Sequence, residues 1–131
     1  MDMFVKRSDK FNVEVYVWED ADGEIQATQD KSQVPDRVEE VETVKFVFRR
    51  PNYQDSNSIA HSAKIKRAID GETDADIIEF QDTVLRTLLI DWDLKDKEGQ
   101  SVPTRIVHIN NLQPAIARAA VAGCLQKISI F

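Results

Sequence analysis

The spacing of hydrophobic residues changes near the middle of this chain, and that change constrains the fold more than any other feature. In the first part, apolar side chains recur at every second position: Phe11, Val13, Val15 and Val17. An alternation with a period of two is typical of a strand that buries one face. After Pro51 the apolar spacing becomes that of helices. The sequence therefore predicts an α+β fold in which strands come first and helices follow.

Three strands are expected in the first half. The first covers 11–17 and ends at an Asp-Gly turn, which supplies the positive φ that a tight turn needs. A weaker strand returns over 24–28, and residues 29–40 have no period and are expected to be a loop. The third strand, over 43–48, must stop at Pro51. We expect these strands to form a small N-terminal antiparallel sheet, connected as a meander.

Two helices are expected next. The pair Asp55-Ser56 can cap the first of them, which runs to about Ile69 before Gly71 ends it. The second begins near Thr73 and has the strongest apolar stripe in the chain: Ile77, Phe80, Val84 and Leu88. This spacing is that of one face of a helix, so the segment is predicted to be amphipathic.

A polar connection, from Asp91 to about Asn111, leads to the last of about three helices, which begins near Pro114 and runs to about Ile128. Small residues on one face of it would let another helix approach closely: Ala115, Ala119, Ala122 and Gly123. Because no repeat or flexible linker is present, residues 1–131 are predicted to form a single domain, with strands and an acidic loop mostly in 1–50 and helices mostly in 51–131.

Negative charge is concentrated in one segment. The chain has 17 Lys and Arg against 23 Asp and Glu, a formal net charge of −6. Residues 19–42 hold nine of these acids and only two bases. An acidic chain lacks the positive field that phosphate binding requires, so no nucleic-acid partner is expected. We expect 19–42 to act as a local acidic arm that docks either on Arg49 and Arg50 or on a basic partner.

Targeting signals and cysteine content favour a reducing cytoplasm. No apolar run is long enough for a signal peptide or a membrane span, so no membrane partner is expected. The single Cys124 cannot form an internal disulfide and lies in an Ala-rich run, which favours the role of a small buried apolar residue.

Two acidic turns are candidate cation sites. Residues 18–29 look at first like a calcium-binding loop, but Trp18 and Gln29 stand where that loop needs an acid and a bidentate Glu. A hairpin turn is favoured there. Residues 91–99 contain three aspartates, but the interleaved lysines favour a solvated turn with Trp92 and Leu94 pointing inward.

No catalytic pattern stands out. His61, expected on a helix surface, and His108, expected in a loop or edge, have no Cys or acid at ligand spacing. No nucleophile is paired with a base, and the 4 glycines are not clustered into a phosphate-binding loop. The sequence therefore predicts a protein that is not an enzyme and that has no catalytic residue, cofactor or metal.

Two segments together resemble small phage tail-assembly proteins. The first is Phe46-Val47-Phe48-Arg49-Arg50-Pro51-Asn52-Tyr53, a strand that ends in a Pro-containing turn before helices. The second, over 88–103, contains a turn of the form W-D-L-x-(D/E)-x-x-G-x-x-(V/L)-P. It precedes a final helix that begins L-x-P-x-(I/L)-A, here 112–117. The similarity covers about residues 44–120.

The resemblance implies a non-enzymatic protein of the host cytoplasm. It is that of a tail assembly chaperone that accompanies the tape-measure protein, or of a baseplate-hub assembly protein, and such proteins bind a long helical, aggregation-prone partner. The alternative is a structural subunit of the tail, neck or baseplate that stays in the virion. Self-association is left open.

Candidate partner-binding residues follow from helix-in-groove recognition, which needs spaced apolar anchors. We select the end of the second helix, the last helix and the arginine pair: Leu88, Leu89, Ile90, Trp92, Ile116, Ala119, Arg49 and Arg50. Both apolar faces are explained equally well as the core of the domain itself. The arginines could grip a partner carboxylate, or one of them could pair with the acidic segment 19–42.

Overall fold

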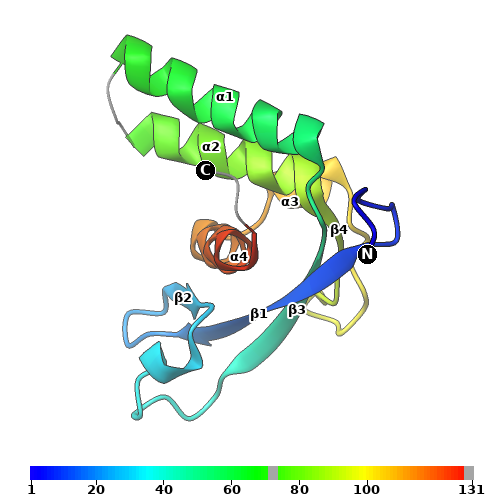
Figure 1. Ribbon diagram of the computed structural model, residues 1–131. Coiled ribbons are helices and arrows are strands. Elements are labelled where there is room, and N and C mark those ends of the chain that lie inside the picture. Colours follow the sequence, from blue (N-terminus) through cyan, green and yellow to red (C-terminus); the bar gives the residue numbers. More distant parts are fainter. Residues whose placement is uncertain (71–73, 129–131) are drawn as a thin grey trace.

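A four-stranded antiparallel sheet and a group of helices make up the protein (Figure 1). The computed structural model describes residues 1–70 and 74–128, without the side chains of 62–78. Its elements are β1 (Lys10–Glu19), β2 (Ile25–Thr28), the 3-10 turn η1 (Lys31–Gln33), β3 (Glu42–Arg49), α1 (Tyr53–Asp70), α2 (Asp74–Leu88), β4 (Leu89–Trp92), α3 (Ile106–Asn110) and α4 (Pro114–Lys127). The predicted α+β class, with an antiparallel sheet before helices, is confirmed.

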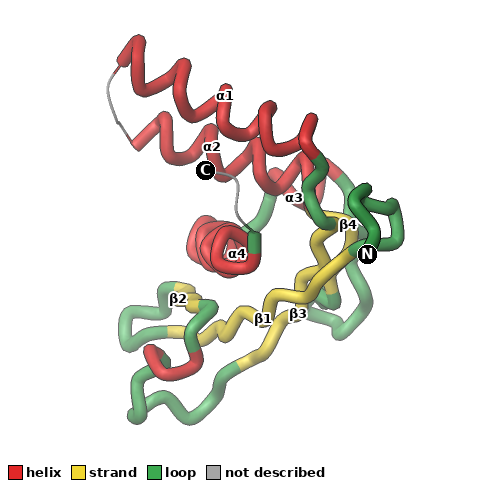
Figure 2. Tube along the Cα trace, viewed as in Figure 1, coloured by secondary structure: helices red, strands yellow, loops and turns green. Residues whose placement is uncertain are grey.

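The order of the strands differs from a meander. The sheet runs β2-β1-β3-β4, so β1 lies between β2 and β3. β1 pairs with β3 from Lys10↔Arg49 to Val17↔Glu42, whereas β2 pairs with the last part of β1 alone. The four residues of β2 offer a short edge, and β1 has a second, longer edge free for β3. The loop between β2 and β3 is long enough to carry the chain to that edge (Figure 2).

The fourth strand was not predicted. α2 ends at Leu88 and β4 begins at the next residue, within the stretch that continues the helical apolar stripe. β4 pairs antiparallel with β3 through Phe48↔Leu89 and Phe46↔Trp92, with an irregularity between them. Four residues are too few for a recognisable period of two, so contact with β3 decides their conformation.

The core lies between one face of the sheet and the helices. Alternate residues of β1 and β3 point to this face and are buried: Phe11, Val13, Val15, Val17, Val44, Phe46 and Phe48. α4 lies between the sheet and the pair formed by α1 and α2, and it contacts β1, β2 and α2 (Figure 1). Residues of α1, α2 and α4 complete the core from the helical side: Ile59, Val84, Leu85, Leu88, Ile116, Ala119, Ala120, Val121 and Cys124.

The small face of α4 packs mainly on strands, whereas we expected a helix there. Gly123 shows how close the approach is, because a Cβ built on it would lie 2.3 Å from Cγ1 of Val13 in β1. No side chain larger than hydrogen fits at this distance without movement of β1 or α4. Gly123 therefore sets the spacing between the last helix and the central strand.

We expect Gly123→Ala to lower the free energy of unfolding by about 1–2 kcal/mol. Overpacking costs about 1–3 kcal/mol, and the better helix propensity of alanine offsets up to about 1 kcal/mol of it. Urea denaturation followed by circular dichroism measures the change. The control is Gln126→Ala, an exposed position of the same helix. Equal stability of Gly123→Ala and wild type would contradict the close approach.

Cys124 of α4 is fully buried, as the sequence predicts for a small apolar residue. Burial raises the pKa of its thiol to about 12, so it stays protonated near neutral pH.

We expect the thiol of Cys124 to react with a disulfide reagent at pH 8 only as fast as the protein unfolds. Labelling in native buffer and in urea tests this, and rapid labelling of the native protein would contradict it.

Candidate protein-binding surfaces

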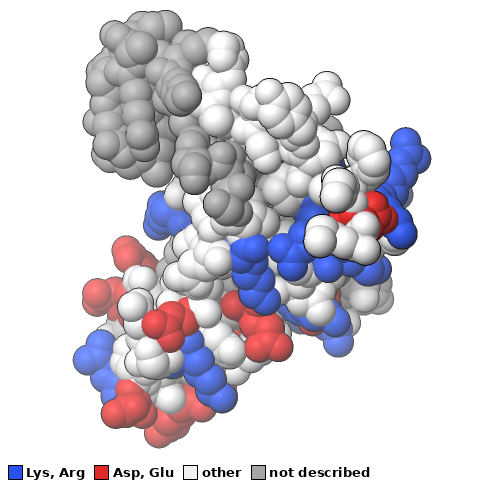
Figure 3. Space-filling model, in the orientation of Figure 1, with Lys and Arg blue, Asp and Glu red and all other residues white. Residues whose placement is uncertain are grey.

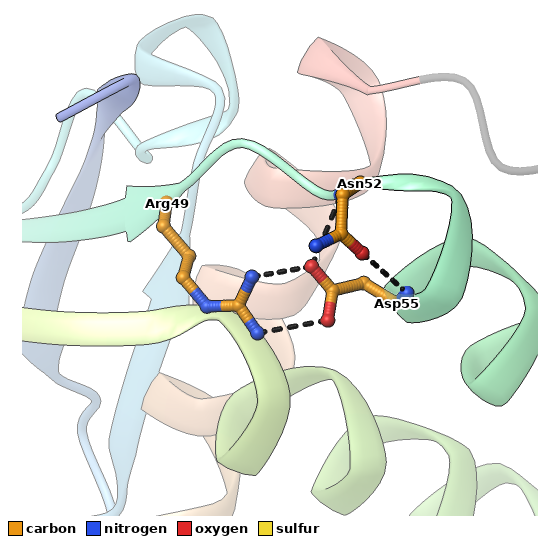
Figure 4. Close-up of polar contacts among 3 residues, drawn as sticks. All are labelled: Arg49, Asn52 and Asp55. Atoms are coloured by element: carbon orange, nitrogen blue, oxygen red, sulfur yellow. Dashed lines mark hydrogen bonds and ion pairs between the residues drawn. The ribbon is translucent and has the colours of Figure 1, made fainter. Parts of the chain in front are cut away.

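The start of α1 is held by a reciprocal pair of hydrogen bonds (Figure 4). Oδ1 of Asn52 accepts the N–H of Asp55 at 2.9 Å, and Oδ2 of Asp55 accepts the N–H of Asn52 at 3.0 Å. This arrangement satisfies backbone donors that the first turn of a helix leaves unpaired. The expected cap at Asp55-Ser56 is therefore wrong by three residues, because Asn52 precedes the helix and Asp55 lies inside its first turn.

Arg49 joins the end of β3 to this helix start. Its guanidinium donates to both carboxylate oxygens of Asp55, with Nη2 at 2.9 Å from Oδ1 (Figure 4). The bidentate contact, helped by the N–H of Asn52, lowers the pKa of Asp55 against the opposing effect of burial. The same contact raises the pKa of Arg49. Arg49 thus has a structural partner, and that partner lies outside the acidic segment 19–42.

Arg50 remains exposed but also contacts the body of the protein. Its guanidinium lies 4.9 Å from the ring centroid of Phe11, and Nη1 donates to the backbone oxygen of Lys127 at 3.2 Å. The expectation that the acidic segment docks on Arg49 and Arg50 is therefore not met. The two arginines instead hold α1 and α4 at the end of the sheet where β1 begins.

Most of the apolar residues that we selected for partner binding lie in the core: Leu88, Trp92, Ile116 and Ala119. Trp92 packs edge to face on Phe46, and its Nε1 donates to the backbone oxygen of Val102 at 2.7 Å. Leu89 is half-buried, and Ile90 is 43% exposed. The burial of these four residues accords with the alternative that the two apolar faces form the core of the domain itself. Among the selected residues, Ile90 and Arg50 are exposed at the surface.

Other exposed apolar residues lie on α3. Ile106 is 62% exposed and Val107 is 57% exposed, both on α3. Oγ1 of Thr104 lies 3.4 Å from Oδ1 of Asp91, which places the approach to α3 next to β4. We call Ile90, Ile106 and Val107 the β4–α3 surface. The sequence analysis predicted a polar connection over 91–111. The apolar residues within 106–109 are the signal that could have identified this surface.

The acidic segment folds around a cleft of about 640 Å³. Its lining is made by the end of β1, the start of β2 and residues before β3. Five carboxylates and one guanidinium surround it, for a formal charge of −4: Glu19, Asp20, Glu39, Glu40, Glu42 and Arg37. Apolar side chains lie between them: Val17, Trp18, Ala21, Ile25 and Val38. We call this the acidic cleft. Figure 3 shows many acidic side chains, with some basic ones among them, in the lower part of the molecule, where Figure 1 places β2.

The two acidic turns share one backbone design. Oδ1 of Asp20 accepts the N–H groups of the residues two and four positions later, and Oδ1 of Asp96 does the same. Each turn ends on a glycine with positive φ, +80° at Gly23 and +77° at Gly99. These hydrogen bonds, with one from Gln26, lower the pKa of Asp20. The hairpin predicted at 19–23 is present, and its first carboxylate holds the turn.

Other titratable groups of the described chain do not gather into a site. Oδ1 of Asp93 accepts the N–H of Lys45 at 2.7 Å, which continues the β3–β4 pairing. His61 is exposed on α1, as expected, and His108 is half-buried on α3, where a loop or edge was expected. Among the described residues, no three His, Cys, Asp or Glu side chains are arranged to hold a metal ion. Within the same residues, no helix is both long and apolar enough to cross a membrane.

We expect the Arg49–Asp55 pair to make stability depend on pH in the acid range. The lowered pKa of Asp55 means that its contribution is complete above about pH 4, the ordinary aspartate value, and is lost as the pH falls through the folded-state pKa. Asp55→Asn should cost about 2 kcal/mol at pH 7 and less at pH 2, because the carboxyl takes up a proton as the pH falls. Urea denaturation at both values, with Glu98→Gln as control, measures this. A deficit that is equal at both pH values would contradict the contribution of the pair.

Comparison with protein families, curated proteins and solved structures finds no match to this chain.

Proposed function

We propose that this protein is a non-enzymatic phage tail assembly protein that binds a helical segment of a tape-measure or baseplate-hub protein. The observation that carries the proposal is the exposed apolar β4–α3 surface. Its Ile90 lies within one of the segments in which the sequence resembles tail-assembly proteins, and Ile106 and Val107 lie between two of them. The proposed place of action is the host cytoplasm during assembly.

The W-D-L turn explains why those segments and that surface belong together. The turn begins at Trp92 and ends at Pro103, so it connects β4 directly to the approach to α3. The hydrogen bond from Trp92 to Val102 and the bridge Lys95↔Ser101 hold the turn closed. The residues that carry the resemblance thus act on packing, and they connect β4, which carries Ile90, to α3, which carries Ile106 and Val107.

The chemistry of the surface suits an amphipathic helix. Aliphatic side chains on a short helix and an adjacent strand offer anchors to apolar residues spaced three and four apart on a partner. Complete burial of one such side chain contributes about 1.5–3 kcal/mol. The net negative charge of the chain, which is concentrated in 19–42, supports solubility before the partner is bound and faster encounter with a basic one.

Co-expression with the tape-measure protein of the same phage tests the proposal. We expect the wild type to keep that protein soluble and the double variant Ile106→Asp/Val107→Asp to reduce the soluble fraction at least about tenfold, because two anchors are lost. The matched control is Val41→Asp, an exposed valine outside the β4–α3 surface. Full rescue by a folded double variant would contradict the proposed surface.

Mass spectrometry of purified particles separates the chaperone from a structural subunit. A chaperone is absent from the finished particle, whereas a subunit of the tail, neck or baseplate is present in stoichiometric amount. Stoichiometric presence would contradict the chaperone role and favour the structural one.

A further inference from the structure

The two ends of β1 carry opposite charge. Around its first residue lie six bases, which we call the basic end: Lys6, Arg7, Lys10, Arg49, Arg50 and Lys127. Three acids lie among them, Asp2, Asp9 and Asp55, so the formal charge of this end is +3. The last residues of β1 line the acidic cleft, whose formal charge is −4. Figure 3 shows the separation, with basic side chains mostly near the N-terminal segment and acidic ones mostly near β2.

Exposed apolar side chains lie in the N-terminal loop of the basic end, directly before Lys6 and Arg7. Met3 and Phe4 are each 84% exposed, and Val5 is also exposed beside Lys6 and Arg7. Hydrogen bonds to carboxylates order this loop, since Asp2 accepts the N–H of Phe4 and Asp9 accepts the N–H of Lys6. An ordered loop that presents apolar side chains to water is a candidate interaction surface.

The acidic cleft has the complementary composition. Half-buried Trp18, Ile25 and Val38 form its apolar lining, and carboxylates surround them. A protein interface usually has an apolar centre and a polar rim, and rims of opposite charge attract one another during encounter. The basic end and the acidic cleft both contain apolar side chains among charged ones, and their charges are opposite.

The two complementary ends cannot meet within one molecule. β1 has 10 residues, which at about 3.3 Å per residue separates its ends by about 30 Å. That distance exceeds the Debye length of about 10 Å at 0.1 M salt, so the ends hardly neutralise one another. The loop that carries Phe4 is also bonded to Asp9 at the start of β1, which keeps it at the basic end.

We infer that copies of this chain associate head to tail, with the basic end of one copy, led by Phe4, seated in the acidic cleft of the next. A pair joined in this way still has one free basic end and one free acidic cleft. The contact is therefore heterologous, and it builds a ring where the rotation closes and a filament where it does not. This inference does not depend on the proposed phage function.

Sedimentation velocity over a range of protein concentrations is the first test. We expect species larger than a dimer at low salt, and dissociation when the salt is raised from about 0.05 M to about 0.5 M, where charged contacts are screened. A monomer at about 1 mM protein, or a species that stops at the dimer, would overturn the inference.

Charge reversal identifies the two surfaces. Lys6→Glu/Arg7→Glu changes the formal charge of the basic end from +3 to −1, so that both ends are acidic. Glu39→Lys/Glu40→Lys changes the formal charge of the cleft from −4 to zero. Each variant alone should stay monomeric, because neither retains both a basic end and an acidic cleft. An equimolar mixture should associate, because the basic end of the second variant meets the acidic cleft of the first. Phe4→Ala should weaken the association of the wild type roughly tenfold.

The matched control is Lys95→Glu/Lys97→Glu, which makes the same change of charge in an exposed turn away from both ends. This control should associate more like the wild type than like the Lys6/Arg7 variant. Thermal unfolding of each variant tests whether it is folded. Association of either reversed variant alone, or a mixture that remains monomeric, would overturn the assignment of the surfaces.

Discussion

The pairing of β1 with β3 is the interaction on which the rest of the structure depends. It places the alternate apolar residues of both strands on one face, and that face is the surface on which α4 and α2 pack. The same register sets Lys10 beside Arg49 at one end and Val17 beside Glu42 at the other. One set of backbone hydrogen bonds therefore produces both the core and the separation of charge along the molecule.

The junction at Arg49 connects this sheet to the helices. A strand that ends on Arg49 and a helix that begins just after Asn52 place a guanidinium and the Asp55 carboxylate in bidentate contact. On the opposite side, Gly123 lets α4 approach Val13 more closely than any other residue would allow. Both contacts concern spacing and direction rather than chemistry at a reactive centre. This fits a protein whose proposed work is binding.

The local elements could be predicted from the sequence where periodicity is strong. The alternation over 11–17 and 43–48 identified two strands, and the burial of Cys124 followed from its apolar surroundings. The candidate site was predicted less well, because Leu88 and Ile116 lie on stripes that look the same whether they face the core of the protein or a partner. Exposed Ile106 and Val107 were hidden in a segment whose average composition is polar.

The sequence by itself determined the α+β class, the two main strands, the long helices and the concentration of acid in 19–42, because each depends on neighbouring residues and their spacing. Only the tertiary structure decided that β3 pairs with β1, that 89–92 is a strand, and that Arg49 meets Asp55. Those outcomes depend on which apolar faces can be buried together. That choice is made between segments far apart in the chain, and local spacing does not record it.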